Sequence, residues 1–239
     1  MKRALVTGGS GDIGAAICHE LAQQGLHIIV HGNRNLARAE SIAVDIIANG
    51  GSAEAVAFDV ADTEKTTAVL NGLLEKGAIQ VLVNNAGYHD DAPMAGMTAT
   101  QWKEVVDVCL NGFFNVTQPL LLPMMQTRWG RIVNVSSVAG IMGNRGQANY
   151  AAAKAGLHGA SKTLALELAS RGVTVNTVAP GIIAGRMIED VFPEEMIKQT
   201  VPMKRAGQPE EVASLVGFLA SDSAGYISGQ IISINGAMC

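Results

Sequence analysis

Short apolar runs and longer helix-like segments alternate along this chain from start to end. The runs carry few polar residues, a pattern typical of strands that are covered on both faces. Because strand–helix repetition builds right-handed βαβ units, the alternation predicts one parallel sheet. The predicted strands are residues 4–7, 27–31, 55–58, 81–83, 131–136, 173–178 and 231–234. The predicted helices are residues 13–24, 36–49, 63–75, 100–126, 150–170 and 209–220.

The chain has no linker, low-complexity stretch or change in composition, so we expect a single domain over residues 1–239. The predicted fold class is α/β: a doubly wound parallel sheet of about seven strands with helices on both faces. Residues 180–209 are the exception, since they lack a clear period and hold several prolines. Such a long segment is an ordinary connection or, more often in a compact domain, a functional loop.

Composition excludes several classes of protein. The chain has 17 Lys and Arg against 21 Asp and Glu, a net charge of −4, whereas nucleic-acid binders are usually basic. No run approaches the ~18 apolar residues that span a bilayer, and the basic residues 1–3 precede only a short apolar run. The three cysteines are widely spaced and form no metal-ligand pattern. We therefore expect a cytoplasmic protein that binds no nucleic acid, membrane or metal.

A glycine-rich turn, residues 7–14 (TGGSGDIG), follows the first predicted strand and opens the first helix. Gly9, Gly11 and Gly14 satisfy G-x-G-x-x-G, in which the glycines allow close backbone approach and the free N–H groups of the helix face a pyrophosphate. Alone, such a turn often serves only geometry. At the start of a βαβ array it favours a Rossmann-type domain that binds a dinucleotide.

The end of the second predicted strand indicates which dinucleotide. The sequence His31-Gly32-Asn33-Arg34 has no carboxylate to bind the ribose 2′-hydroxyl of NAD, and the next acid is Glu40. Arg34 is suited to pair with a 2′-phosphate, and Asn33 to donate a hydrogen bond to it. The alternative is that Arg34 is only a solvated residue at the start of a helix. We expect NADP (NADPH) as the cofactor.

Three side chains suggest proton chemistry downstream of this turn. Tyr150 and Lys154 are four residues apart at the start of a helix, hence on one face. A nearby cation stabilises phenolate, so we expect the pKa of Tyr150 to be lowered towards the working range. Ser136 and Ser137 end the fifth strand, at the sheet edge where ligands bind, and a hydroxyl there can hydrogen-bond a substrate carbonyl. Each feature alone is commonly a turn, cap or surface contact.

Together these features form an ordered set that is specific for one family. Its members are the glycine-rich turn, Asp59-Val60, Asn84-Asn85-Ala86-Gly87, Asn111, Ser137, Tyr150, Lys154 and Pro180-Gly181. The chain resembles the short-chain dehydrogenase/reductase family over essentially its whole length. Within that family it most resembles the 3-oxoacyl-[acyl-carrier-protein] reductases.

The resemblance implies a role for each residue. Tyr150 would donate a proton to the substrate oxygen while NADPH delivers hydride to the carbonyl carbon. Ser137 would polarise the carbonyl, Lys154 would bind the nicotinamide ribose, and Asn111 would hold a water in a proton relay. The implied catalytic residues are thus Asn111, Ser137, Tyr150 and Lys154, with no metal. The implied cofactor-binding residues are Gly8, Ser10, Gly11, Asp12, Ile13, Asn33, Arg34, Asp59, Val60, Asn85, Ala86, Gly87, Tyr150, Lys154, Pro180, Gly181 and Ile183.

The chain departs from the family pattern at three places in the cofactor loops. Asp12 replaces a glycine, and we expect its carboxylate to cap the first helix. Gly11 replaces an arginine frequent in NADPH-dependent relatives, so Arg34 would carry more of the 2′-phosphate recognition. The threonine that usually follows the Pro180-Gly181 pair is missing.

Substrate and partner are indicated less directly. Arg128 and Arg171 match basic positions that dock acyl carrier protein in the resembled reductases, although they are equally well read as two solvated loop charges. Apolar residues of the 180–209 segment and the next loop suit either an acyl channel or ordinary core. They are Met94, Met97, Ile182, Ile183, Met187, Ile188, Val191, Phe192, Met196 and Ile197.

The leading hypothesis is NADPH-dependent reduction of a 3-oxoacyl thioester on acyl carrier protein to the 3-hydroxyacyl thioester, in fatty-acid or related polyene or polyketide synthesis. One alternative is a short-chain enzyme for a free small alcohol, sugar or steroid, and another is a non-catalytic NADP sensor. Small residues along 150–170 and the apolar end 227–239 suggest a homotetramer.

Overall fold

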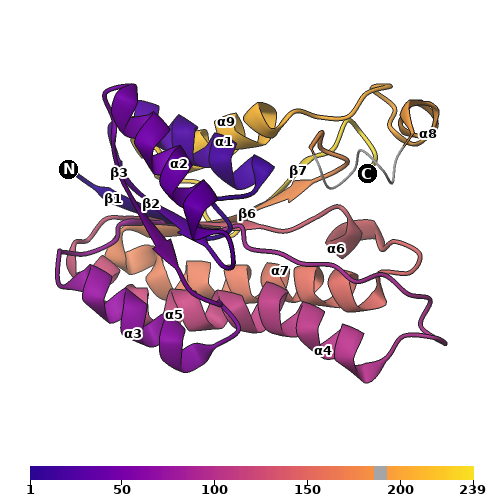
Figure 1. The fold of residues 1–239 in the computed structure, drawn as a ribbon, viewed down its shortest axis with the longest axis horizontal. Coiled ribbons are helices and arrows are strands. Elements are labelled where there is room, and N and C mark those ends of the chain that lie inside the picture. Colours follow the sequence, from indigo (N-terminus) through magenta and orange to yellow (C-terminus); the bar gives the residue numbers. More distant parts are fainter. Residues whose placement is uncertain (186–192) are drawn as a thin grey trace.

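Parallel strands form one central sheet, in the order β3-β2-β1-β4-β5-β6-β7 (Figure 1). The computed structural model describes residues 1–185 and 193–239. Every strand pair among these residues is parallel, and the order reverses direction between β1 and β4. The strands are β1 (Arg3–Val6), β2 (His27–Gly32), β3 (Ser52–Ala57), β4 (Val81–Asn84), β5 (Gly130–Val135), β6 (Val173–Pro180) and β7 (Ile231–Ile234). This confirms the predicted doubly wound α/β fold.

Helices cover both faces of the sheet and supply two apolar cores. On one face, α1 (Asp12–Gln23), α2 (Leu36–Ala48) and α9 (Pro209–Ala220) pack on the sheet, and on the other α3 (Thr63–Leu74), α5 (Gly112–Gln126) and α7 (Ala148–Leu168) do (Figure 1). All residues of β1, β4, β5 and β6 are buried. Burial on both faces explains why these strands are apolar throughout.

The edge strand β3 departs most from its predicted bounds. It begins at Ser52, three residues before the predicted start, because its first residues are too polar to read as a buried strand. Glu54 in this stretch accepts hydrogen bonds from Arg3 at 3.2 Å and lies 3.3 Å from His27. An edge strand has one neighbour, so polar side chains there reach partners at the rim.

The long helix predicted over 100–126 is interrupted. It consists of α4 (Ala99–Val106), a π-helical turn at Asp107–Asn111 and α5. A π turn inserts one extra residue, so it rotates the face that the following side chains present. Two short helices, α6 (Ala139–Met142) and α8 (Glu194–Thr200), lack the apolar period of a longer helix and were not predicted.

In the described part of the chain, one helical stretch, Ala99–Gln126, is long and apolar enough to cross a membrane by length and composition alone. Its most apolar window has a mean hydropathy of 1.3 and is 39% buried. Within it, Val116, Leu120 and Met124 pack into the core against the sheet. Because a core helix of a soluble protein passes the same test, this feature assigns no membrane segment.

Candidate active site

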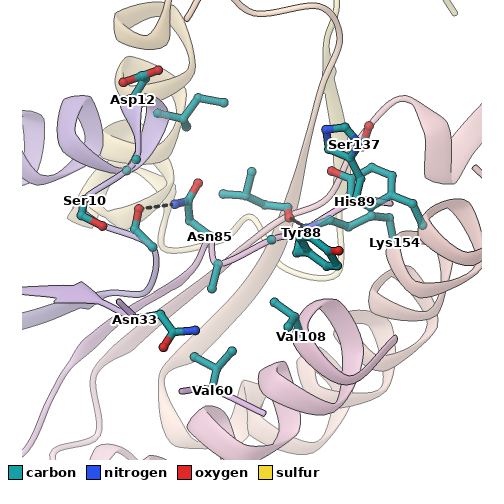
Figure 2. A pocket seen from close by; sticks show the side chains of 18 of the residues that line it. Ser10, Asp12, Asn33, Val60, Asn85, Tyr88, His89, Val108, Ser137 and Lys154 are labelled. Atoms are coloured by element: carbon teal, nitrogen blue, oxygen red, sulfur yellow. Dashed lines mark hydrogen bonds between the residues drawn. The ribbon is translucent and has the colours of Figure 1, made fainter. Parts of the chain in front are cut away.

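A cleft of about 890 Å³ opens at the carboxyl ends of the strands, where β1 and β4 diverge. This is where doubly wound sheets bind ligands, and the volume is at the upper end of the usual ~300–1,000 Å³. All seventeen residues predicted to bind cofactor line this cleft, and so does Ser137. Figure 2 shows Ser10 and Asn33 on one side of it and Ser137 and Lys154 on the other.

The glycine-rich turn forms the first wall, and its shape requires glycine. Gly8 has φ 63°, and a Cβ on Gly14 would lie 2.1 Å from the Gly8 carbonyl oxygen. Gly11 is the N-cap residue of α1 and, among the described residues, supplies no side-chain cap. The first N–H groups of α1 therefore face a cradle in which the backbone can approach a ligand closely, which fits a dinucleotide pyrophosphate.

Hydrogen bonds hold this turn to two neighbouring strands. The Thr7 hydroxyl accepts from the backbone N–H groups of Asn85 and Ala86, both at 3.0 Å. The Asn85 amide donates back to the carbonyls of Thr7 at 3.0 Å and Gly8 at 3.1 Å. The loop after β4 thus fixes the turn after β1, and both border the cleft.

His31 is a further clamp, which the sequence analysis missed. Its Nδ1 accepts a hydrogen bond from the Gly8 N–H at 3.0 Å, so its Nε2 carries the proton and donates to the Phe58 carbonyl at 2.8 Å. The imidazole is buried, and desolvation lowers its pKa to about 4 against weaker opposing effects of Phe58 and Asp59. His31 is therefore a neutral connector between β2, the glycine-rich turn and the end of β3.

Asp12 does not cap α1, so that prediction is wrong. It lies in the first turn of the helix, one residue beyond the N-cap Gly11, and its carboxylate accepts from the Arg38 guanidinium of α2 at 3.0 Å. Figure 2 shows Asp12 at the edge of the site, apart from Asn85. The ion pair offsets a negative charge close to where a pyrophosphate would lie. Asn33 and Arg34 are both exposed at the end of β2 and border the same cleft.

The opposite wall carries the serine, tyrosine and lysine. Ser137 follows β5, and Tyr150 stands in the first turn of α7 with Lys154 one turn later. The Lys154 side chain is 2% exposed, donates to the Val135 carbonyl at 2.8 Å and lies 5.6 Å from the centre of the Tyr150 ring. A buried ammonium so close to a phenol is suited to stabilise phenolate.

The pKa of Tyr150 is raised, not lowered as predicted. Desolvation of the phenol raises it most, and the positive charge of Lys154 and a hydrogen bond with Ser137 lower it by less. The predicted effect of Lys154 is present, but burial outweighs it. The phenol is therefore protonated at neutral pH and can act as a proton donor.

The structure does not bring Asn111 into the cleft. Its side chain is exposed and donates to the Asp107 carboxylate at 2.8 Å, within the π turn. The residue of that turn that faces inward is Cys109, which is buried beside Tyr150 and Ala153. Its thiol donates to the Tyr88 carbonyl at 3.2 Å and accepts from the Tyr88 N–H at 3.4 Å. The π turn explains the error, because helical periodicity does not reveal which residue it turns inward.

A histidine in the loop after β4 also borders the cleft and was not predicted. The imidazole of His89 lies with its centre 6.1 Å from that of the Tyr150 ring, at 70° to it, and its Nδ1 is 3.0 Å from the Asp91 carboxylate. Figure 2 shows His89 beside Ser137 and Lys154. The available signal was position, since His89 follows the Asn-Asn-Ala-Gly sequence at the end of a central strand.

The remaining predicted residues lie apart from the cleft. Arg128 and Arg171 are exposed and close together, since Arg128 donates to the Ser170 carbonyl at 3.3 Å. They precede β5 and β6, so they lie at the opposite edge of the sheet from the cleft. Of the expected channel residues, Met187, Ile188, Val191 and Phe192 lie outside the described residues. Ile183 lines the cleft and is buried, whereas Met94, Met97, Ile182, Met196 and Ile197 are not among its lining residues.

A dinucleotide cradle at the switch point of a doubly wound sheet, with serine, tyrosine and lysine opposite, defines an oxidoreductase of Rossmann type. The family model described as short chain dehydrogenase matches residues 2–196. The chain belongs to the short chain dehydrogenase family, whose enzymes use a nicotinamide cofactor.

The similar proteins share one printed activity. The chain is 46% identical over 237 residues to a 3-oxoacyl-[acyl-carrier-protein] reductase of Synechocystis sp., covering 98% of this chain and 96% of that protein. It is 43% identical over 241 residues to the reductase of the same name from Staphylococcus aureus, covering 99% and 98%. The corresponding protein of Aggregatibacter actinomycetemcomitans is 42% identical over 237 residues, with 98% of both chains covered.

Proposed function

We propose that this protein reduces a 3-oxoacyl thioester on acyl carrier protein to the 3-hydroxyacyl thioester, with NADPH as the reductant. The observation that carries the proposal is the convergence of Ser137, Tyr150 and Lys154 on one cleft with the glycine-rich turn. The near full-length similarity to reductases of that name supports the choice of substrate.

The side chains divide the chemistry. A bound nicotinamide supplies the hydride. Tyr150, protonated because burial raises its pKa, donates its proton to the carbonyl oxygen. Ser137 donates a hydrogen bond to the same oxygen as negative charge develops there. Lys154 stabilises the phenolate that remains, from a buried position 5.6 Å from the ring centre.

NADP is proposed over NAD on the charge at the end of β2. Arg34 is exposed beside the cleft, where a 2′-phosphate can reach it, and the described wall has no carboxylate between Gly32 and Leu36. A bidentate arginine contact with a phosphate is among the stronger charge-assisted pairs. Gly11 leaves this recognition mainly to Arg34 and Asn33.

Acyl carrier protein is proposed as the partner that presents the substrate. Arg128 and Arg171 form an exposed basic pair that suits an acidic partner. We expect Arg128→Glu with Arg171→Glu to lower kcat/KM for carrier-bound substrate and to spare a small ketone. Equal loss on both substrates contradicts docking at this pair.

We also propose a cytoplasmic homotetramer. Large apolar side chains are exposed on the outer helices, a pattern that marks association surfaces. They include Phe114 and Leu122 on α5, Leu166 on α7 and Phe218 on α9. Light scattering at micromolar concentration tests this, and a stable monomer overturns it.

The decisive assay measures NADPH oxidation with acetoacetyl-acyl carrier protein and, in parallel, with a panel of free ketones. We expect kcat/KM for the carrier-bound substrate to exceed that of any free ketone. Turnover of a free sugar, steroid or small ketone alone would favour the alternative enzyme class. Binding of NADPH without any turnover would favour the sensor.

A further inference from the structure

Each turnover leaves Tyr150 without its proton, so a group connected to solvent must return one. Tyr150 is half-buried, and the groups around it differ in their ability to do this. Lys154 is buried and donates to the Val135 carbonyl, and Asn111 is exposed and bonded to Asp107 outside the cleft. Cys109 is beside the ring, but its thiol is bonded to the backbone of Tyr88.

His89 combines closeness to Tyr150 with access to solvent. Its ring centre lies 6.1 Å from that of the Tyr150 ring, and its side chain is 34% exposed. A histidine side chain gains and loses protons readily near neutral pH. That spacing allows transfer by direct contact of ring substituents or through one water.

The partners of His89 are fixed by several hydrogen bonds. One Asp91 oxygen lies 3.0 Å from His89 Nδ1, and the other accepts from the Gln147 amide at 2.8 Å. Asn149, next to Tyr150, donates to the Asp90 carbonyl at 3.0 Å, and the Ala92 N–H donates to the Gly146 carbonyl at 2.9 Å. The loop bearing His89 is thus tied to the segment that begins the tyrosine helix.

This anchoring sets the orientation of the imidazole. With Nδ1–H donated to the Asp91 carboxylate, Nε2 is left as the nitrogen that exchanges a proton, and the carboxylate stabilises the imidazolium. Gln147 holds Asp91 from the opposite side, so the carboxylate stays in position when the imidazole changes charge. A histidine held in this way is a pre-oriented proton carrier.

We propose that His89, oriented by Asp91, returns the proton to Tyr150 between turnovers; this rests on the proposed carbonyl reduction. Tyr150 passes its phenolic proton to the carbonyl oxygen as the carbon accepts hydride. The His89 imidazolium then gives its Nε2 proton to the phenolate, and the neutral imidazole takes one proton from water. One hydride and one proton are consumed for each carbonyl, and His89 and Tyr150 return to their starting forms.

The titratable and charged groups that face this pair come from several elements. Asp91 and Asp90 lie on the same loop, Lys154 on α7, Cys109 on the π turn and Glu104 on α4. Each of them affects the field at the cleft in every variant. For this reason the test depends on adding back a proton carrier rather than on a pH profile alone.

The test compares two rates in His89→Ala. In a single turnover with enzyme in excess, Tyr150 already holds its proton, so we expect NADPH oxidation within about twofold of the wild-type rate. In steady state the phenol must be reprotonated, so we expect kcat to fall about 10- to 100-fold. Added imidazole should restore steady-state turnover in proportion to its concentration and leave the single-turnover rate unchanged.

Two further variants separate this role from a structural one. His19→Ala removes another partly exposed histidine, which pairs with Asp45 at 3.5 Å far from the cleft, and should change neither rate nor respond to imidazole. Asp91→Asn keeps the shape of the partner and should lower the steady-state rate alone, by less than His89→Ala. An equal fall of both rates in His89→Ala, no fall in either, or no rescue by imidazole overturns the proposal.

The proposal is distinguishable from the proposed function. Wild-type protein that reduces none of the tested carbonyls refutes the proposed function only. The coupling of His89 to Tyr150 is then read by NMR of the labelled imidazole, whose titration curve should move in Tyr150→Phe. An unchanged curve overturns the inference.

Discussion

The two walls of the cleft are built in different ways. The adenosine wall consists of the glycine-rich turn and its neighbours, and backbone groups and a neutral histidine hold it in place. The catalytic wall consists of Ser137, Tyr150, Lys154 and His89, side chains brought together from β5, α7 and the loop after β4. On the first wall shape decides function; on the second the charge state of buried groups does.

This difference predicts opposite responses to substitution. A change on the adenosine wall should alter the backbone, and so affect stability and the binding of cofactor together. A change on the catalytic wall should alter a proton and leave the fold and cofactor binding intact. The variants below test this division, from the largest expected effect to the smallest.

Tyr150→Phe is expected to have the largest effect. It removes the proton donor but keeps the ring that packs beside Cys109 and Ala153. We expect kcat to fall about 10³-fold, in the usual range for loss of a general acid. NADPH binding, measured by fluorescence, and the melting temperature should stay near wild type. Loss of binding in parallel with kcat would contradict the separation of the two walls.

Gly14→Ala is the matching change on the adenosine wall. Its new methyl group would lie 2.1 Å from the Gly8 carbonyl oxygen, so the turn must shift. We expect about 3 kcal/mol of lost stability, as for overpacked sites, together with loss of NADPH binding. Urea unfolding and NADPH titration measure the two effects.

Gly72→Ala is the control, because a Cβ at that position in α3 meets nothing within 4 Å. Replacing an exposed helical glycine with alanine should stabilise the protein by up to about 1 kcal/mol. Cofactor binding should not change. If both glycine variants behave alike, the contact between Gly14 and Gly8 does not determine the shape of the turn.

His31 adds a pH dependence to the adenosine wall. Burial lowers its pKa from 6.5 to about 4, so the folded protein resists a proton that the unfolded chain accepts. The stabilisation is complete above pH 6.5 and is lost as the pH falls towards 4. We expect a loss of about 2 kcal/mol between pH 6.5 and 5. Urea unfolding of His31→Gln should lack this part of the slope, and identical slopes would contradict it.

How far the sequence anticipates each wall follows from the same difference. The strand order, the cleft and all the cofactor-lining residues follow from apolar periods and a glycine pattern, because these encode backbone geometry directly. The bounds of β3 were less accurate, since the polar residues of an edge strand hide its period.

The catalytic wall was anticipated only in part. Ser137, Tyr150 and Lys154 were found from their spacing. Cys109 was missed because a π turn changes which residue faces inward. The direction of the Tyr150 pKa shift was wrong because burial depends on tertiary packing, which no local pattern encodes. The Asp12–Arg38 pair likewise joins two helices, α1 and α2, that are separate in sequence.

Arg34→Ala is expected to have the smallest effect, and it tests the adenosine wall for charge rather than shape. The exposed guanidinium contributes only to binding of the 2′-phosphate, so KM for NADPH should rise about tenfold while KM for NADH stays constant. Arg38→Gln is the matched control. It removes one partner of Asp12 near the pyrophosphate, so both cofactors should weaken alike, by about two- to threefold because the pair is partly exposed. Added salt should reduce the Arg34 effect, since exposed charges are screened. If Arg34→Ala weakens NADH as much as NADPH, this arginine does not select the cofactor.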